Sequence, residues 1–140
     1  MAIKVTRNDV WTVMIDDRAG GAADKLEALA KAGANLEMVF ARRTPEQPGR
    51  GILFAGPIKG KKVTAAALAA GFTRAENMHG VKAEGGDKPG LGAKIARALA
   101  GAGVSFRGMS AAVVGSKFSS SIVVDSADDA AKAVAALKKL

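Results

Sequence analysis

Asp17-Arg18-Ala19-Gly20 returns 70 residues later as Asp87-Lys88-Pro89-Gly90, in a chain of 140 residues. The stretch Gly33-Ala34-Asn35-Leu36 has its counterpart in Gly103-Val104-Ser105-Phe106 at the same spacing. A self-match at a constant offset indicates a duplicated structural unit. The sequence therefore predicts two copies of one module, each half the length of the chain.

The composition indicates a folded protein whose two modules, residues 1–70 and 71–140, share an interface. The chain is 49% apolar and 24% charged, which is typical of a globular protein. A 70-residue module alone buries only about 60% of its unfolded surface, so we expect the two copies to pack together. Cysteine is absent, and neither a signal peptide nor a stretch of about 18 apolar residues is evident. A cytoplasmic location is the expectation.

Hydrophobic periodicity divides the first half into five elements. Alternation of apolar and polar residues predicts strands, and apolar residues at helical spacing predict amphipathic helices. The first module is thus predicted to have a strand at 10–15, a helix at 21–32, strands at 36–40 and 52–55, and a helix at 61–70. Val63 and Leu68 are expected to point inward from the second helix.

The second half repeats this order, with a strand at 80–84, a helix at 91–102, strands at 106–114 and 121–125, and a helix at 127–139. A β-α-β-β-α unit needs a fourth strand to complete a ferredoxin-like sheet.

Residues 72–77 can supply that strand to the first module. The second module has no residues left after its last helix, and at the 70-residue offset the counterpart of 72–77 is Ala2 to Arg7. We therefore predict that residues 1–8 pair with the sheet of the second module.

The turn from the first strand into the first helix of each module is the candidate binding site. Free N–H groups and the positive end of the helix dipole favour a carboxylate there. Glycine lets a ligand approach the backbone, and the Asp side chain can meet an ammonium group, so a zwitterionic amino acid would suit the site. An isolated Asp-x-x-Gly is more simply a good turn and helix cap. Its repetition in the same position favours the functional interpretation.

The candidate ligand-binding residues lie in the turns and just after the helices. They are Asp17, Arg18, Ala19, Gly20, Gly21 and Asn35 in the first module, and Asp87, Lys88, Pro89, Gly90, Leu91 and Ser105 in the second.

The order β-α-β-β-α-β, with Asp87-Lys88-Pro89-Gly90-Leu91 before a helix and Gly33-Ala34-Asn35-Leu36 after one, resembles the ACT domain, a regulatory module that binds small molecules. The resemblance covers essentially the whole chain as two tandem copies. It implies an α+β fold of two ferredoxin-like modules side by side, with antiparallel sheets and helices on one face. It also implies that an amino acid binds at the turns, at an interface where the sheets of two modules join.

Two departures from the family pattern affect the expected number of sites. Ala19 stands where the family has proline, and Ser105 stands where asparagine is typical. One strong and one degenerate site are therefore as consistent with the sequence as two equal sites.

The resemblance implies a non-catalytic sensor without cofactor or metal. The expected partners are a small-molecule ligand, a second copy in a homodimer through the uncovered sheet face or an edge, and either a regulated enzyme or another protein. No His, Cys, Asp and Glu spacing typical of a metal site occurs, and no phosphate-loop pattern occurs. No membrane contact is expected.

Two other classes of function are weaker alternatives. Gly103-Val104-Ser105-Phe106-Arg107 resembles the phosphate-binding loop of acylphosphatases, but it follows the first helix of its module, whereas the enzymes' loop precedes it. The net charge of +8 invites nucleic-acid binding, yet the charge is evenly divided between the halves. An RNA-binding sheet stacks bases on exposed aromatics. The chain has six aromatic residues, one Trp and five Phe, and the alternation pattern places most of them in the core.

Overall fold

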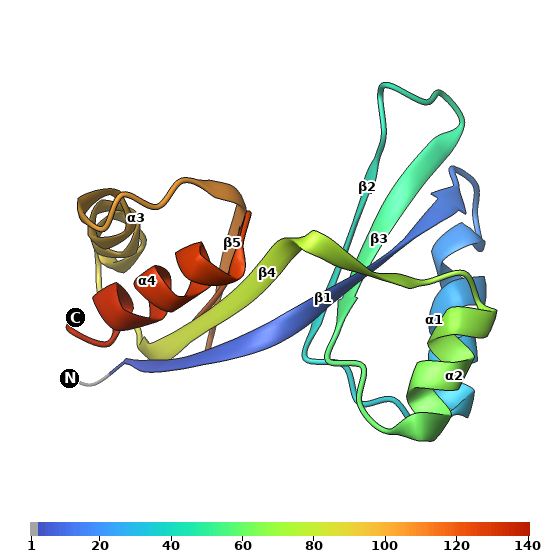
Figure 1. Ribbon diagram of the computed structural model, residues 1–140, viewed down its shortest axis with the longest axis horizontal. Coiled ribbons are helices and arrows are strands. Elements are labelled where there is room, and N and C mark those ends of the chain that lie inside the picture. Colours follow the sequence, from blue (N-terminus) through green and yellow to red (C-terminus); the bar gives the residue numbers. More distant parts are fainter. Residues whose placement is uncertain (1–2) are drawn as a thin grey trace. The chain divides into compact units, whose positions relative to one another are not determined.

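The computed structural model describes residues 3–140, which form four helices and six strands (Figure 1). In chain order these are β1 (Lys4–Asp16), α1 (Gly21–Lys31), β2 (Met38–Arg43), β3 (Arg50–Gly56), α2 (Lys61–Ala69), β4 (Thr73–Gly86), α3 (Leu91–Gly101), β5 (Phe106–Val114), β6 (Lys117–Val124) and α4 (Ala127–Leu137). In that part of the chain, no helix has the length and apolar character needed to cross a membrane.

The chain forms two compact units that exchange strand segments. One unit is Asp9–Ala75, and the other combines Met1–Asn8 with Glu76–Leu140. Strands β1 and β4 each run from one unit into the other, so the strand order is β2-β3-β1-β4 in the first unit and β1-β4-β6-β5 in the second. The sequence predicted two strands in each of these regions, but the structure has one long strand in each. The predicted boundary between the two sequence repeats, at residue 70, stays a prediction. A compact unit need not have the same bounds as a repeat.

The N-terminal strand completes the second module, as predicted from the missing fourth strand. Val5 is buried in the same core as Val81 and Ile122, and Ile3 packs against that core. Residues 1 and 2, which belong to the predicted pairing segment, lie outside the described residues. The predicted α+β class of two ferredoxin-like modules is confirmed.

Each unit has its own core between one face of its sheet and a pair of helices (Figure 1). In Asp9–Ala75, Trp11, Val13 and Ile15 of β1 alternate inward toward Leu29 of α1. In the other unit Leu99 of α3 takes the place of Leu29, and both leucines have 0% exposure.

The prediction that Leu68 faces inward is wrong. Leu68 is 57% exposed, while Val63 and Ala67 of the same helix are buried. Residues four apart share one side of a helix, so Val63 and Ala67 form the buried stripe and Leu68 falls outside it.

The repeat changes its spacing within the hairpins. Met14 pairs with Ile52, and Glu84, 70 positions after Met14, pairs with Ser119 rather than Ile122. Ile52 and Ser119 are thus equivalent at a spacing of 67, because the loop between β2 and β3 is longer than the two-residue loop between β5 and β6. The sequence match of Ile52 with Ile122 is therefore not a structural equivalence.

Candidate functional site

The first turn folds back tightly onto the start of α1. Gly20 has φ 89°, in the left-handed region that favours glycine. The Arg18 N–H donates to the carbonyl oxygen of Asp16 at 2.9 Å, and the Gly21 N–H donates to that of Arg18 at 3.1 Å. A Cβ placed on Gly21 would lie 2.2 Å from the Asp16 carbonyl oxygen, so the first helical residue must be glycine.

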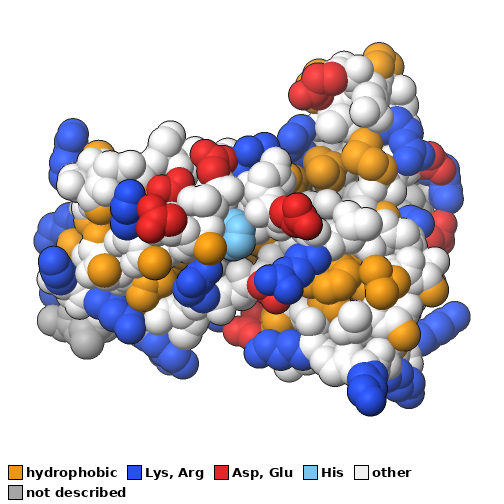
Figure 2. Space-filling view, viewed as in Figure 1, with side chains coloured by type: hydrophobic (Ala, Val, Ile, Leu, Met, Phe, Trp, Pro, Cys, Tyr) orange, Lys and Arg blue, Asp and Glu red, His pale blue; other side chains and the backbone are white. Residues whose placement is uncertain are grey.

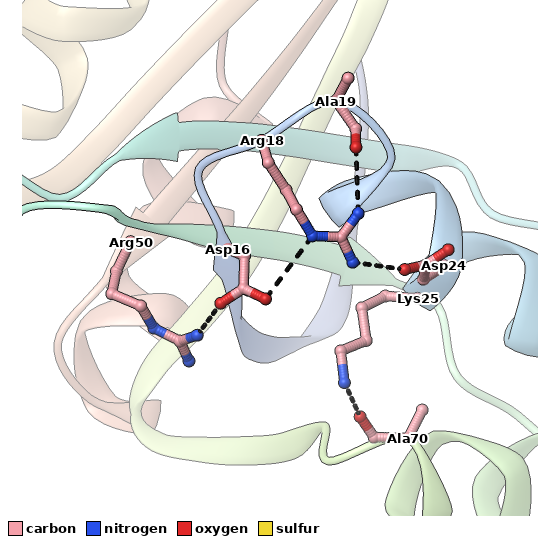
Figure 3. Close-up of polar contacts among 7 residues, drawn as sticks. All are labelled: Asp16, Arg18, Ala19, Asp24, Lys25, Arg50 and Ala70. Atoms are coloured by element: carbon pink, nitrogen blue, oxygen red, sulfur yellow. Dashed lines mark hydrogen bonds and ion pairs between the residues drawn. The ribbon is translucent and has the colours of Figure 1, made fainter.

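The polar side chains of the first turn pair with one another (Figure 3). The guanidinium of Arg18 donates to the carboxylate of Asp24 at 2.9 Å and lies 3.7 Å from that of Asp16. The other oxygen of Asp16 accepts from Arg50, at the start of β3. The guanidinium of Arg18 also donates to the backbone of its own turn, at Ala19.

The Asp17 carboxylate, the group expected to meet a ligand's ammonium, is engaged by the protein itself. Arg43 of β2 donates from Nε to Asp17 Oδ2 at 2.8 Å. The space beside Gly20 is also taken, since a Cβ added there would lie 3.2 Å from Nη1 of Arg18. In the first turn the Asp17 carboxylate is thus paired with Arg43, and the guanidinium of Arg18 lies beside Gly20.

The second turn has the same backbone conformation at its glycine but a looser attachment to the helix. Gly90 has φ 81°, and the Asp87 N–H donates to the Ser116 carbonyl at 2.8 Å. The Leu91 N–H reaches the Lys88 carbonyl at 3.3 Å. Leu91 itself is 7% exposed, so this turn accommodates a large core side chain where the first turn admits only glycine.

None of the four ion pairs of the first turn has a counterpart in the second, within residues 3–140. The strand registers and the 70-residue spacing give the equivalent pairs. They are Asp87 with Val113 for Asp17 with Arg43, Gly86 with Lys117 for Asp16 with Arg50, Lys88 with Lys94 for Arg18 with Asp24, and Lys88 with Gly86 for Arg18 with Asp16. Valine and glycine cannot form an ion pair, and two lysines repel each other. Within residues 3–140, no side-chain ion pair engages Asp87, Lys88, Lys94 or Lys117.

The two turns therefore differ in net charge. Three arginines and three aspartates balance in the first turn, whereas the equivalent positions of the second turn carry three lysines and one aspartate. The excess positive charge of the second turn adds to the positive end of the α3 dipole. This arrangement favours an anionic ligand.

Space is also left open at the second turn. A Cβ added to Gly90 or Gly92 would meet no heavy atom within 4 Å. No backbone acceptor in the described chain receives the N–H of Gly92 or Ala93, as expected for the first turn of a helix. These two donors are available to a carboxylate of a bound solute.

Comparisons with known proteins bear on the fold. No protein-family model and no curated protein sequence matches the chain. The regulatory subunit of aspartate kinase from Thermus thermophilus superimposes with a TM-score of 0.69 at 17% identity, covering 99% of this chain and 96% of that one. Protein BT0572 from Bacteroides thetaiotaomicron superimposes with a TM-score of 0.74 at 19% identity, covering 94% of this chain and 88% of that one. A structure of aspartokinase alpha and beta subunits superimposes with a TM-score of 0.66 at 20% identity, covering 99% of this chain and 96% of that one. The chain has the tandem ACT-type fold.

Asn35 and Ser105 do not join the turns within a single ACT-type module. Each follows the first helix of its module, whereas the turn precedes that helix. The helix has 11 residues, so its two ends lie about 16 Å apart. Asn35 and Ser105 are both exposed, and they can reach a ligand at a turn only from a neighbouring module.

Sequence reasoning missed the residues that close the first ACT-type turn. Asp16, Asp24, Arg43 and Arg50 were not among the candidate residues. The differences between Asp24 and Lys94 and between Gly21 and Leu91 are readable from the 70-residue alignment. The pairing of Asp17 with Arg43 depends on how the hairpin folds over the turn, and the constant 70-residue offset misassigns Arg50, whose counterpart by strand register is Lys117 and not Ser120.

The residues behind the two alternative functions have other surroundings in this ACT-type fold. Arg107, in the stretch that resembles an acylphosphatase loop, lies in β5 and donates to Asp125 at 3.0 Å. Trp11, Phe72 and Phe118 are buried, as expected.

The expectation that most aromatics point into the core fails for three of the six, Phe40, Phe54 and Phe106. Phe54 lies beside Phe40 on the sheet face turned away from the helices. Phe40 is 48% exposed and Phe106 is 41% exposed. Both lie on the outermost strands in the sheet order, β2 and β5, which have a neighbour on one side only.

Proposed function

We propose that this chain is a non-catalytic regulatory protein that binds an amino acid at the turn Asp87–Leu91. The solved structures with the same fold include regulatory subunits of aspartate kinase, which supports a regulatory role. The observation that carries the choice of site is the second turn, whose charged side chains form no ion pair within residues 3–140, set against a first turn whose carboxylate is paired with Arg43. One site per chain follows.

The charges of the second turn favour an amino acid with an acidic side chain. Its α-carboxylate would accept from the free N–H groups of Gly92 and Ala93 at the start of α3. Its ammonium group would meet Asp87, the one carboxylate of the turn. Lys88, Lys94 and Lys117 then remain to attract the second carboxylate, which a neutral amino acid lacks.

The proposed binding form is a homodimer. Ser105 lies at the far end of α3 from the turn, so the equivalent residue at the ligand comes from another module, and we propose that a second copy supplies it. The outermost strand β5 suits such an association, because Gly108–Val114 contains no charged residue and no proline that would block pairing with another strand. A ligand bound between copies favours the associated arrangement through its higher affinity for it, and that change is what a regulated enzyme would sense.

A thermal-shift series tests the site and the ligand class together. Aspartate and glutamate should raise the melting temperature more than alanine or leucine, and lysine should have no effect. A ligand at about a hundred times its Kd stabilises the folded state by about 2.7 kcal/mol, which such a screen detects. Asp87→Ala should abolish the shift, while the matched variant Asp17→Ala should retain it.

Calorimetric titration then gives the stoichiometry, expected to be one ligand per chain. Two ligands per chain, or a shift lost in Asp17→Ala and kept in Asp87→Ala, would place the site elsewhere. A lysine-induced shift as large as that of glutamate would contradict the charge argument.

A further inference from the structure

The sheet face turned away from the helices is apolar in the Asp9–Ala75 unit. Residues that alternate with the core positions lie on this face, and the strand pairing brings Met14, Met38, Phe40, Ile52 and Phe54 together there. The rings of Phe40 and Phe54 are 5.9 Å apart, at an angle of 45°. In Figure 2, hydrophobic side chains gather over β2, with Lys and Arg side chains beside them. No described helix of the unit packs on this face.

The second module serves as an internal control, because it has the same sheet without the apolar face. The positions equivalent to Met14, Met38, Phe40, Ile52 and Phe54 are Glu84, Gly108, Ser110, Ser119 and Ser121. There Glu84 pairs with Lys82 at 3.7 Å, on the same face. The fold thus forms with small and polar residues at these positions, so folding alone does not require the apolar residues of the first module.

We propose that this face, the open face of the Asp9–Ala75 unit, docks a second protein through a segment that carries apolar side chains flanked by carboxylates. Contiguous exposed apolar surface marks interaction sites in soluble proteins. The proposal rests on the regulatory role proposed above, and it identifies where the regulated protein is contacted.

Charge selects the chemistry of the partner. Arg42 lies on the open face beside Ile52, and its guanidinium donates only to the backbone carbonyl of Arg43. No carboxylate in residues 3–140 pairs with Arg42, and Asp16, at the end of the same face, is held by Arg50. A second copy would bring an unpaired Arg42 and a further charge of +8, with no free carboxylate on this face to meet them. An acidic, apolar partner supplies both complements.

Fluorescence anisotropy with two labelled peptides tests the proposal on the full chain. One peptide carries leucines on one helical face and glutamates on the other, and the second has lysines in place of the glutamates. The glutamate peptide should bind and the lysine peptide should not.

Two variants copy the residues of the second module. Phe40→Ser reproduces Ser110, and Arg42→Ala reproduces Ala112. Each should weaken binding of the glutamate peptide by about tenfold, as expected for central interface residues. The matched controls are Leu68→Ser, at a position 57% exposed on α2, and Arg97→Ala, at an exposed position without an ion pair within residues 3–140. Both should stay within about twofold of the parent.

Equal weakening by Arg97→Ala and Arg42→Ala would mean that the positive charge of the whole chain attracts the peptide, and the proposal would fail. Unchanged binding to Phe40→Ser would also overturn it. If sedimentation shows that Phe40→Ser converts a dimer to a monomer, a second copy covers this face instead. The ligand thermal shift does not involve these residues, so its success or failure is read separately.

Discussion

The turns before α1 and α3 share a backbone conformation but differ in what surrounds it. Gly20 and Gly90 have φ 89° and 81°, and each precedes a helix of 11 residues. Around Gly20 the side chains neutralise one another, whereas around Gly90 positive charge is left without a partner. Duplication therefore preserved the geometry of the site, while substitutions at its rim closed one copy and left the other open. The candidate site is defined by those neighbours rather than by the Asp-x-x-Gly motif itself.

The largest expected effect is the loss of stability when a core leucine is truncated, and it tests whether the cores of the two modules are equivalent. Leu29→Ala and Leu99→Ala each leave a cavity at a fully buried position, so each should lower the free energy of unfolding by about 3 kcal/mol. Urea unfolding followed by circular dichroism measures both losses. The single Trp11 adds a fluorescence signal from the Asp9–Ala75 unit alone. A loss in one variant several times that in the other would show that the modules are not equivalent scaffolds.

Glycine substitutions in the two helix starts should have opposite signs. Gly21→Ala forces its Cβ against the Asp16 carbonyl and should destabilise the protein by about 1–3 kcal/mol. Gly92→Ala adds a methyl group where no atom lies within 4 Å, and it should stabilise the protein by about 0.4–1 kcal/mol through the helix preference for alanine. Thermal melts of the two variants measure the difference. Stabilisation by Gly21→Ala would contradict the tight first turn.

The smallest effect concerns the paired and unpaired aspartates. Asp17→Asn removes the exposed ion pair with Arg43 and should cost about 0.2–1 kcal/mol at low salt, and less at high salt. Asp87→Asn breaks no ion pair but removes the one negative charge among three lysines, so its cost should be smaller than that of Asp17→Asn and should fall less at high salt. Chemical denaturation at two ionic strengths measures both. Equal salt dependence in the two variants would remove the contrast between the turns.

The architecture was predictable from the sequence because helical spacing and the number of strands per module can both be read along the chain. Helical spacing marked α1 to within one residue of its observed end, and the count of strands showed that the second module lacked one. The prediction of a fourth strand from the N-terminus followed from that count, and Val5 lies in the second core accordingly.

The asymmetry of the site could not be predicted in the same way. It depends on Arg43 of β2 reaching Asp17 across 26 positions of chain and on Arg50 of β3 reaching Asp16, and the unequal hairpin loops shift the repeat by three residues between β2 and β3. At the constant 70-residue offset Arg50 aligns with Ser120, whereas the strand register makes Lys117 its counterpart. Finding the residues that pair with the aspartates of a turn requires the strand register, which is a property of the tertiary structure.

The strands that pass between the two units set an order for folding during synthesis. The Asp9–Ala75 unit has all of its strands and helices as soon as residue 75 has left the ribosome. Residues 3–8 must wait, because their partners in β4 and the core residues of α3 and α4 are translated only afterwards. At a translation rate of about 5–20 residues per second, that wait lasts several seconds. During this interval the N-terminal part of β1 is unpaired. It is shielded from other chains only once the chain has been translated through α4.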